Sequence, residues 1–286
     1  MRNKQQLSYS DYEKRIAELC ENRKIKVSII GKSIMDRNVH KLEIGAGEKK
    51  IVLLGGVCGE SEVCETLLSF AEEFIKAQEE GKRPCGTNPA YVSRYRGLVI
   101  YPLINPDALE YRCFGVNDDN PIKNRLISMN AESQDFSDWS ANGRGVSLER
   151  NSPIDFEKRR SCENARGIFN GAPSGFSGNT PESEPELCCL LSDISGYENV
   201  RALIQISKGK NGVHTPCRHQ RDERSERVMK CILSSCRAQS KALSPDDCGI
   251  TDLVYKRYGI YSYKVSLEKC ELKYLRGLLY SVPVTV

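Results

Sequence analysis

The sequence predicts an α/β fold in which a mixed, largely parallel sheet carries helices on both faces. Three nearly continuous apolar runs, RGLVIYPLIN, VRALIQIS and IYSYKVSL, have the composition of strands that are covered on both sides. Segments with helical periodicity lie between or before these runs, and such an alternation of strand and helix is typical of this fold class.

The elements can be predicted in order from the N-terminal side. Four residues share one face of a helix within SYSDYEKRIAELCEN, namely Tyr12, Ile16, Leu19 and Cys20. KVSIIGKSI and NVHKLEIG then indicate two short strands around a turn at Asp36 to Asn38. The apolar segment KKIVLLGG predicts another strand, and helical spacing from Val63 to Ile75 predicts a helix that ends near Gly81.

The second half of the chain begins with a long loop-rich region, about residues 111–180, which is rich in Asn, Ser, Gly and Arg. A loop region of this length is usually functional, and Trp139 within it favours an ordered surface over the sheet. Helices are expected at about Pro185 to Ile194 and Arg224 to Ala238. We expect residues 1–286 to form a single domain.

Composition excludes some partners. A formal net charge of +4 is too small to indicate nucleic acid or an acidic membrane surface. No run of about 18 apolar residues is present, so neither a membrane span nor a signal peptide is expected. The 13 cysteines contain no C-x-x-C pair and no even framework, which favours reduced thiols and a cytoplasmic location.

The stretch KKIVLLGGVCGESEVCE carries polar side chains at the end of a buried strand, where α/β enzymes usually place their chemistry. Cys58, Glu60, Ser61 and Glu62 follow two glycines. A structural interpretation explains all of them, because acidic residues suit a helix N-terminus and Ser61 is a plausible N-cap.

The order of six segments resembles the zinc metallocarboxypeptidases of the carboxypeptidase A type, especially the bacterial γ-D-glutamyl-diaminopimelate peptidases. The segments are SYSDYEKRIAEL, IGKSIMDRNVHKLEIGAGEKKIVLLGG, YPLINPDALE, WSANGRGVSLERN, TPESEPEL and RYGIYSYKVSL. The resemblance covers almost the whole chain. It implies an eight-stranded mixed sheet with a zinc ion above the strand ends, and peptides or peptidoglycan stem-peptide fragments as partners.

The family's zinc-binding and catalytic positions hold different residues here. The H-x-x-E positions are Cys58 and Ser61, the third ligand position is Ile206, and the general-base position is Ser266. A tyrosine of the family falls more loosely at Lys241. Zinc hydrolysis requires three protein ligands, an open position for water and a carboxylate base. We therefore expect no catalytic residue, no metal ligand and no cofactor, although the family uses zinc.

The resemblance implies that the substrate-binding positions are better preserved. Arg144 occupies the place of an arginine that polarises the scissile carbonyl, and Glu149, Arg150 and Asn151 occupy a segment that grips a terminal carboxylate. Glu149 replaces an asparagine, so either Arg144 or Arg150 neutralises it or the preferred ligand differs, an amino group being a better match. Lys208 is a candidate to replace the zinc charge by reaching Glu60 or Glu62.

Three functions remain in competition. The first is a catalytically inactive carboxypeptidase-fold protein that still binds peptides. The second is an active metallocarboxypeptidase with a rebuilt zinc site, for which Cys58 is the one former ligand position able to bind metal. The third makes Cys58 a nucleophile, which needs a base from among His40, His214 and His219.

Overall fold

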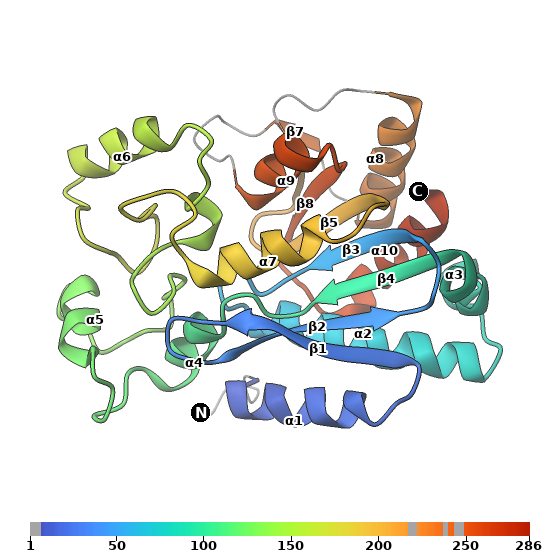
Figure 1. Ribbon diagram of the computed structural model, residues 1–286, viewed down its shortest axis with the longest axis horizontal. Helices are drawn as coiled ribbons and strands as arrows, with labels where there is room; N and C mark the ends of the chain where they lie inside the picture. The colour runs from blue at the N-terminus through green and yellow to red at the C-terminus, as the bar shows by residue number, and fades with distance from the viewer. Residues whose placement is uncertain (1–6, 217–221, 237–239, 243–248) are drawn as a thin grey trace.

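The computed structural model describes residues 7–216, 222–236, 240–242 and 249–286, and an eight-stranded sheet forms its centre (Figure 1). The strand order is β1-β2-β4-β3-β5-β8-β6-β7. The strands are β1 (Ile25–Lys32), β2 (Asn38–Ile44), β3 (Lys49–Leu54), β4 (Arg96–Tyr101), β5 (Val200–Lys208), β6 (Gly212–Thr215), β7 (Ser240–Ala242) and β8 (Ser262–Leu267).

The sheet is mixed, with a parallel centre. β4, β3, β5 and β8 run parallel, whereas β2 is antiparallel to β4 and β6 is antiparallel to β8. The expected turn between the first two strands forms an antiparallel hairpin. The carboxyl ends of the four parallel strands meet at one edge, where ligands of such sheets usually bind. The expected fold class is confirmed.

Helices cover both faces of the sheet. One face packs against α1 (Tyr9–Cys20), α2 (Ser61–Glu79), α8 (Glu223–Cys236) and α10 (Leu272–Thr285). The other face packs against α7 (Pro185–Ser195) and α9 (Ile250–Tyr258). Because side chains of a strand alternate between faces, this division separates neighbouring strand residues into two cores. Among the described residues, no helix combines the length and apolar content that crossing a membrane requires.

Shorter helices connect the strands and extend the molecule beyond their ends. They are α3 (Pro89–Tyr95), α4 (Pro106–Phe114), α5 (Lys123–Met129) and α6 (Phe156–Ala165), with 3-10 turns at Pro84–Gly86 and Leu148–Arg150. Figure 1 shows α5 and α6 past the end toward which the arrows of β3 and β4 point. Trp139 is buried there against Tyr111 and Phe136, and its indole N–H donates to the Ala141 carbonyl at 2.7 Å.

A buried amide holds the loop-rich region to the start of α7. Asn151 is fully buried, and its Nδ2 donates to the carbonyls of Ser177 and Thr180 at 2.8 and 3.0 Å. The same nitrogen lies 3.1 Å from Ser183 Oγ, and Oδ1 accepts the Glu184 N–H at 3.2 Å. One side chain therefore satisfies polar groups from several turns that have no sheet or helix to pair with.

We expect Asn151→Ala to lower the free energy of unfolding by about 2–4 kcal/mol, because several buried polar groups lose their partner at once. Asn130→Ala is the matched control. Its amide also donates to two loop carbonyls, but at an exposed site, so the expected loss is below about 0.5 kcal/mol. Urea unfolding of both variants tests this. Equal losses would contradict the structural role of Asn151.

Candidate functional site

The loop between β3 and α2 turns sharply at glycines. Gly59 has a φ of +69°, and a Cβ there would lie 2.5 Å from the Leu109 amide nitrogen of α4. The loop therefore packs directly on α4, which only glycine permits. The expectation that Ser61 caps α2 is wrong: Glu60 is the N-cap, and Ser61 is the first helical residue.

Glu60 does not cap the helix with its side chain. Its carboxylate instead accepts the Cys58 N–H at 2.9 Å, and only 5% of the residue is exposed. Burial raises the pKa of the Glu60 carboxyl above its ordinary value, against the effect of that hydrogen bond. Arg112 of α4 reaches the Cys58 carbonyl at 3.4 Å, which adds a second tie between the loop and α4.

The next part of the site lies on β5 and β8. Gln205 stands beside Lys264 and Ser207 beside Ser266, and the two serine hydroxyls are 2.9 Å apart. Ile206 points to the opposite face, into the core, where 1% of it is exposed. Ile206 therefore does not share a face of the sheet with Ser266, and strand alternation places Ser207 beside Ser266 instead.

Glu149 forms the centre of the site, and its cation is Lys264. The Lys264 ammonium lies 2.7 Å from Glu149 Oε1, which also accepts a hydrogen bond from Gln205 Nε2. The other oxygen accepts the Ile250 N–H, at the start of α9, at 3.3 Å. Of the two alternatives that the sequence left open, neutralisation of Glu149 by Arg144 or Arg150 is not what the structure shows, since the partner is Lys264.

Electrostatics favour the ionised form of this pair. Burial alone would raise the pKa of Glu149, but the Lys264 ammonium and the hydrogen bonds hold it below its usual value. Burial alone would lower the pKa of Lys264, and the Glu149 carboxylate outweighs burial and raises it. Cys58 and Glu60 add to that rise, so the ammonium lies among the groups of the β3–α2 loop.

The remaining predicted binding residues have partners other than Glu149. Arg150 lies 3.7 Å from the buried Glu163 carboxylate of α6, and the Asn151 amide is committed to loop carbonyls. Arg144 remains half exposed, with its guanidinium 3.7 Å from Glu184. Glu149, Gln205 and Lys264, together with the β3–α2 loop, form what we call the strand-end site. Arg150 and Asn151 instead have other protein partners.

The Lys208 ammonium reaches an acidic side chain, as the sequence suggested, but this pair lies away from Glu149, the centre of the site. Its ammonium lies 2.6 Å from Glu62, and both side chains are nearly half exposed. An exposed pair of this kind contributes little charge to a buried site. Lys264, which the sequence reasoning missed, is the buried cation. Its signal was present, because residues 264 and 266 lie on the same side of a strand.

Cys58 has the opposite electrostatics to an activated nucleophile. Burial raises the pKa of its thiol well above the ordinary value, and the carboxylates of Glu60 and Glu149 add to the effect. Of the histidines, His40 lies in β2 beside Glu13, His214 lies opposite Lys264 in β6, and His219 is outside the described residues. The Lys241 side chain also lies outside them.

The donor set at the former ligand positions does not fit a zinc ion. It consists of a thiol with a raised pKa, hydroxyls and an aliphatic side chain that points away, with an ammonium close by. Across the part of the chain that the structure describes, no group of three or more His, Cys, Asp or Glu side chains could hold a metal. Zinc requires at least three such ligands.

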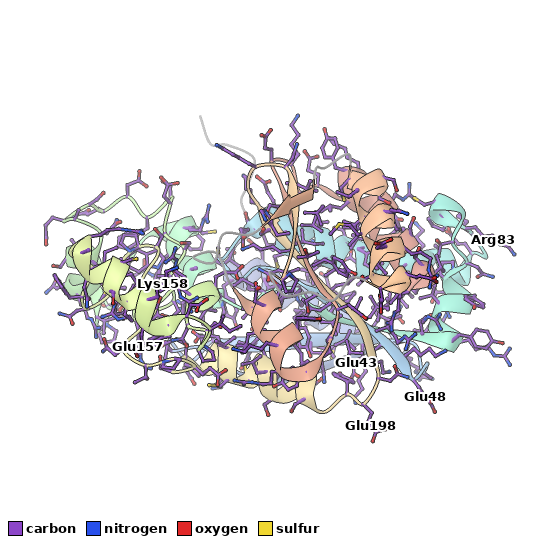
Figure 2. The ribbon with its side chains drawn as sticks, turned by 90° about the horizontal axis from the view of Figure 1, so that it is seen from above. Glu43, Glu48, Arg83, Glu157, Lys158 and Glu198 are labelled. Atoms are coloured by element: carbon purple, nitrogen blue, oxygen red, sulfur yellow. The ribbon has the colours of Figure 1, made fainter. Side chains whose placement is uncertain are left out.

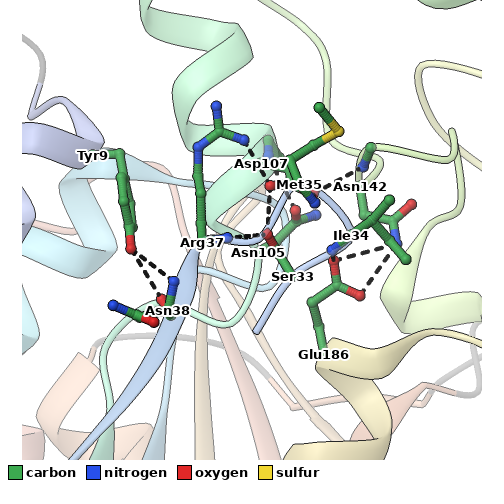
Figure 3. Close-up of polar contacts among 12 residues, drawn as sticks. Tyr9, Ser33, Ile34, Met35, Arg37, Asn38, Asn105, Asp107, Asn142 and Glu186 are labelled. Carbon is green, nitrogen blue, oxygen red and sulfur yellow. Dashed lines mark hydrogen bonds and ion pairs between the residues drawn. The ribbon is translucent and has the colours of Figure 1, made fainter. Parts of the chain in front are cut away.

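A buried polar cluster supports the loop that carries Arg144 (Figure 3). Asp107 of α4 accepts hydrogen bonds from Ser33 at 2.6 Å and Arg37 at 2.8 Å, and from the Gly143 N–H at 3.3 Å. Asn142 Oδ1 accepts the Arg144 N–H at 3.0 Å. The cluster therefore connects the β1–β2 turn, α4 and residues 142–146.

Two more carboxyls enter this cluster from the start of α7. Asn142 Nδ2 donates to Glu184 at 2.6 Å and to Glu186 at 3.3 Å, and Glu186 also accepts the Ile34 N–H at 3.2 Å. Burial, followed by the Asp107 and Glu184 carboxylates, raises the pKa of Glu186 to about 8. At neutral pH the protonated form of Glu186 predominates.

Together, the parallel strand ends, the glycine turn and the polar loops define an α/β protein of the metallocarboxypeptidase class. The profile of the "Zinc carboxypeptidase" family matches residues 10–276. The chain therefore belongs to the zinc carboxypeptidase family. It is 28% identical to "Gamma-D-glutamyl-L-diamino acid endopeptidase 1" of Lysinibacillus sphaericus over 171 residues, which cover 59% of this chain and 42% of that relative. The match thus spans less than half of the relative's length.

Solved structures agree on the fold. Thrombin activatable fibrinolysis inhibitor superposes with a TM-score of 0.69 and 16% identity, covering 97% of this chain and 76% of the other. The murein-tripeptide amidase MpaA of Escherichia coli O157 superposes with a TM-score of 0.54 and 13% identity, covering 90% of each chain. At these identities the similarity shows the fold alone.

We expect Glu186→Gln to change how stability depends on pH. A glutamate with a pKa near 4.5 when unfolded and about 8 when folded binds more protons in the folded state between those values. Its contribution is full below pH 4.5 and is lost as the pH rises to 8. The glutamine variant lacks this loss, so at pH 8.5 its unfolding free energy should exceed the parent's by roughly 2–4 kcal/mol.

Chemical denaturation between pH 5 and 9 measures this difference. Glu48→Gln is the control, because Glu48 projects from the surface (Figure 2). Its pH profile should overlie that of the parent. Parallel profiles for Glu186→Gln and the parent would contradict the assignment of a buried, protonated Glu186.

We expect Lys264→Met to lower the unfolding free energy by about 1–3 kcal/mol, because it leaves the partly buried Glu149 carboxylate without a cation. Adding Glu149→Gln should recover about 1–2 kcal/mol of that loss, the coupling of a partly buried pair. Lys208→Met, at the exposed pair with Glu62, should cost less than about 1 kcal/mol. Additive effects of the two buried substitutions would show that Lys264 and Glu149 do not depend on each other.

Proposed function

We propose that this chain binds the ends of peptides, in particular peptidoglycan stem-peptide fragments, without hydrolysing them. The observation that carries the proposal is the Lys264 ammonium, which pairs with Glu149 among the residues of the β3–α2 loop. A cation fixed there by the chain repels a divalent metal ion from the same place.

Hydrolysis by the family's chemistry needs a metal-bound water and a general base, and this chain would lack both. A zinc-bound water becomes a nucleophile because three protein ligands hold a metal that lowers the water's pKa. The general-base position holds Ser266, whose hydroxyl is hydrogen-bonded to that of Ser207. A serine hydroxyl cannot accept a proton near neutral pH without a basic partner. We infer that water in this site stays unreactive.

Support for peptide binding comes from the loop that carries Arg144. Arg144 has half of its side chain exposed, and the backbone that carries it is fixed by Asn142. A guanidinium held in this way can donate two parallel hydrogen bonds to a carbonyl or carboxylate. The stem-peptide class follows from the Lysinibacillus sphaericus relative, whose name describes cleavage at γ-D-glutamyl-L-diamino acid bonds.

We also propose that the protein acts in the cytosol. Eleven cysteines in the described part of the chain are free thiols, and two of them, Cys64 and Cys270, are buried. Free cysteines in this number suit a reducing compartment.

The test combines metal analysis, hydrolysis and binding. Purified chain incubated with zinc and freed of excess metal should retain substoichiometric zinc. It should leave a γ-D-glutamyl-diaminopimelate peptide intact while binding it in calorimetry. Arg144→Gln should weaken that binding about tenfold, equivalent to the loss of about 1.4 kcal/mol. Arg83→Gln, at an exposed arginine at one end of the molecule (Figure 2), should leave binding unchanged.

Stoichiometric zinc together with peptide hydrolysis that a chelator abolishes would overturn the proposal. That result would favour the alternative of an active metallocarboxypeptidase with a rebuilt zinc site, in which the Cys58 thiolate is a ligand. Absence of both binding and hydrolysis would also overturn it.

A further inference from the structure

We propose that the strand-end site selects a ligand that ends in a carboxamide over one that ends in a carboxylate. This inference rests on the proposed peptide-binding function and specifies the chemistry of the ligand. The groups that carry it are Glu149, Lys264 and Gln205, which come from three segments of the chain and meet at one carboxylate oxygen.

The first argument is the charge of Glu149. Its carboxylate is ionised and has 15% of its side chain exposed, so a ligand that reaches Lys264 also meets Glu149. A second carboxylate there would face a fixed negative charge whose cation is already engaged. A neutral carboxamide avoids this repulsion, and its NH₂ group can donate to the carboxylate.

The second argument is how Glu149 is held. Gln205 is fully buried, so a ligand does not reach it; its Nε2 donates to Glu149 Oε1 and fixes the carboxylate in place. A carboxylate held in this way favours a ligand that brings an N–H group. A carboxylate offers only acceptors, whereas a carboxamide offers two N–H donors.

The third argument excludes an amine as the preferred ligand end. The Lys264 ammonium has three N–H donors, and the described residues accept one of them, at Glu149 Oε1. The remaining donors suit a carbonyl oxygen and repel a second ammonium. The site therefore offers donors from Lys264 next to an acceptor from Glu149, and a carboxamide is complementary to both.

The side chains that the family resemblance assigns to carboxylate binding are not available to a ligand, which strengthens the preference for a carboxamide. Arg150 faces the buried Glu163 carboxylate, and the Asn151 amide is consumed by loop carbonyls. Neither offers the free donors that a terminal carboxylate needs. Arg144 can still bind a carbonyl oxygen of either ligand form, so it contributes affinity without distinguishing them.

The experiment compares two stem peptides that are identical except for a C-terminal carboxamide or carboxylate, titrated into the full chain by calorimetry. We expect the carboxamide form to bind at least tenfold more tightly. Equal binding, or tighter binding of the carboxylate, would overturn this inference and leave the proposed function intact. Binding of neither peptide would overturn both.

Substitutions test which residues set the preference. Glu149→Asn removes the negative charge and frees the Lys264 ammonium, so the preference should reverse toward the carboxylate by about tenfold. Glu72→Asn is the matched control, since it removes an ion-paired carboxylate between α1 and α2, and the preference should stay unchanged. An unchanged preference in folded Glu149→Asn would overturn the inference.

A second variant keeps the test decisive if Glu149→Asn does not fold. Gln205→Met has a similar shape but removes the N–H donor that holds Glu149 Oε1, so it should reduce carboxamide affinity about tenfold while carboxylate affinity changes little. Equal losses for both peptides would show that Gln205 acts on the fold and does not position Glu149 for the ligand. Thermal unfolding of each variant confirms that it is folded before titration.

Discussion

The partly buried ion pair between Lys264 and Glu149 is the constraint on which the site depends. Lys264 comes from the last parallel strand of the sheet and Glu149 from a 3-10 turn, and Gln205 and the Ile250 N–H complete the carboxylate's hydrogen bonds. Four segments of the chain therefore meet at the Glu149 side chain. A carboxylate in this position must keep all of these partners, because an unpaired buried charge is costly.

The fold could be predicted from the sequence because its signals are local and strong. Buried parallel strands such as VRALIQIS are continuous apolar runs, and α1 and α2 have clear helical periodicity. The short helices α3 to α6 could not be predicted, because each lasts only two or three turns and is fixed by tertiary contacts. The start of α4 at Pro106 is an example, since Asn105 directly after an apolar run caps the helix through the Ala108 N–H.

The site was predicted less completely, for a geometric reason. A linear motif assigns residues to positions but does not assign them to faces of a strand. The family resemblance assigns Ile206 and Ser266 to one site, yet strand register pairs Ile206 with Val265 in the core. Lys264 was overlooked because the resemblance drew attention to Ser266, two residues further along the same face. Long-range partners such as Asp107 and Glu186 carry no local signal, so their cluster emerges only in three dimensions.

The ion pair also ties any change at position 58 to residues 149 and 264. A histidine at position 58 would bring an imidazole near the Lys264 ammonium, and a metal ion bound by that imidazole would be repelled by the ammonium. Replacing Lys264 alone would leave the Glu149 carboxylate without its cation. A metal site at this place would therefore require positions 58, 149 and 264 to change together.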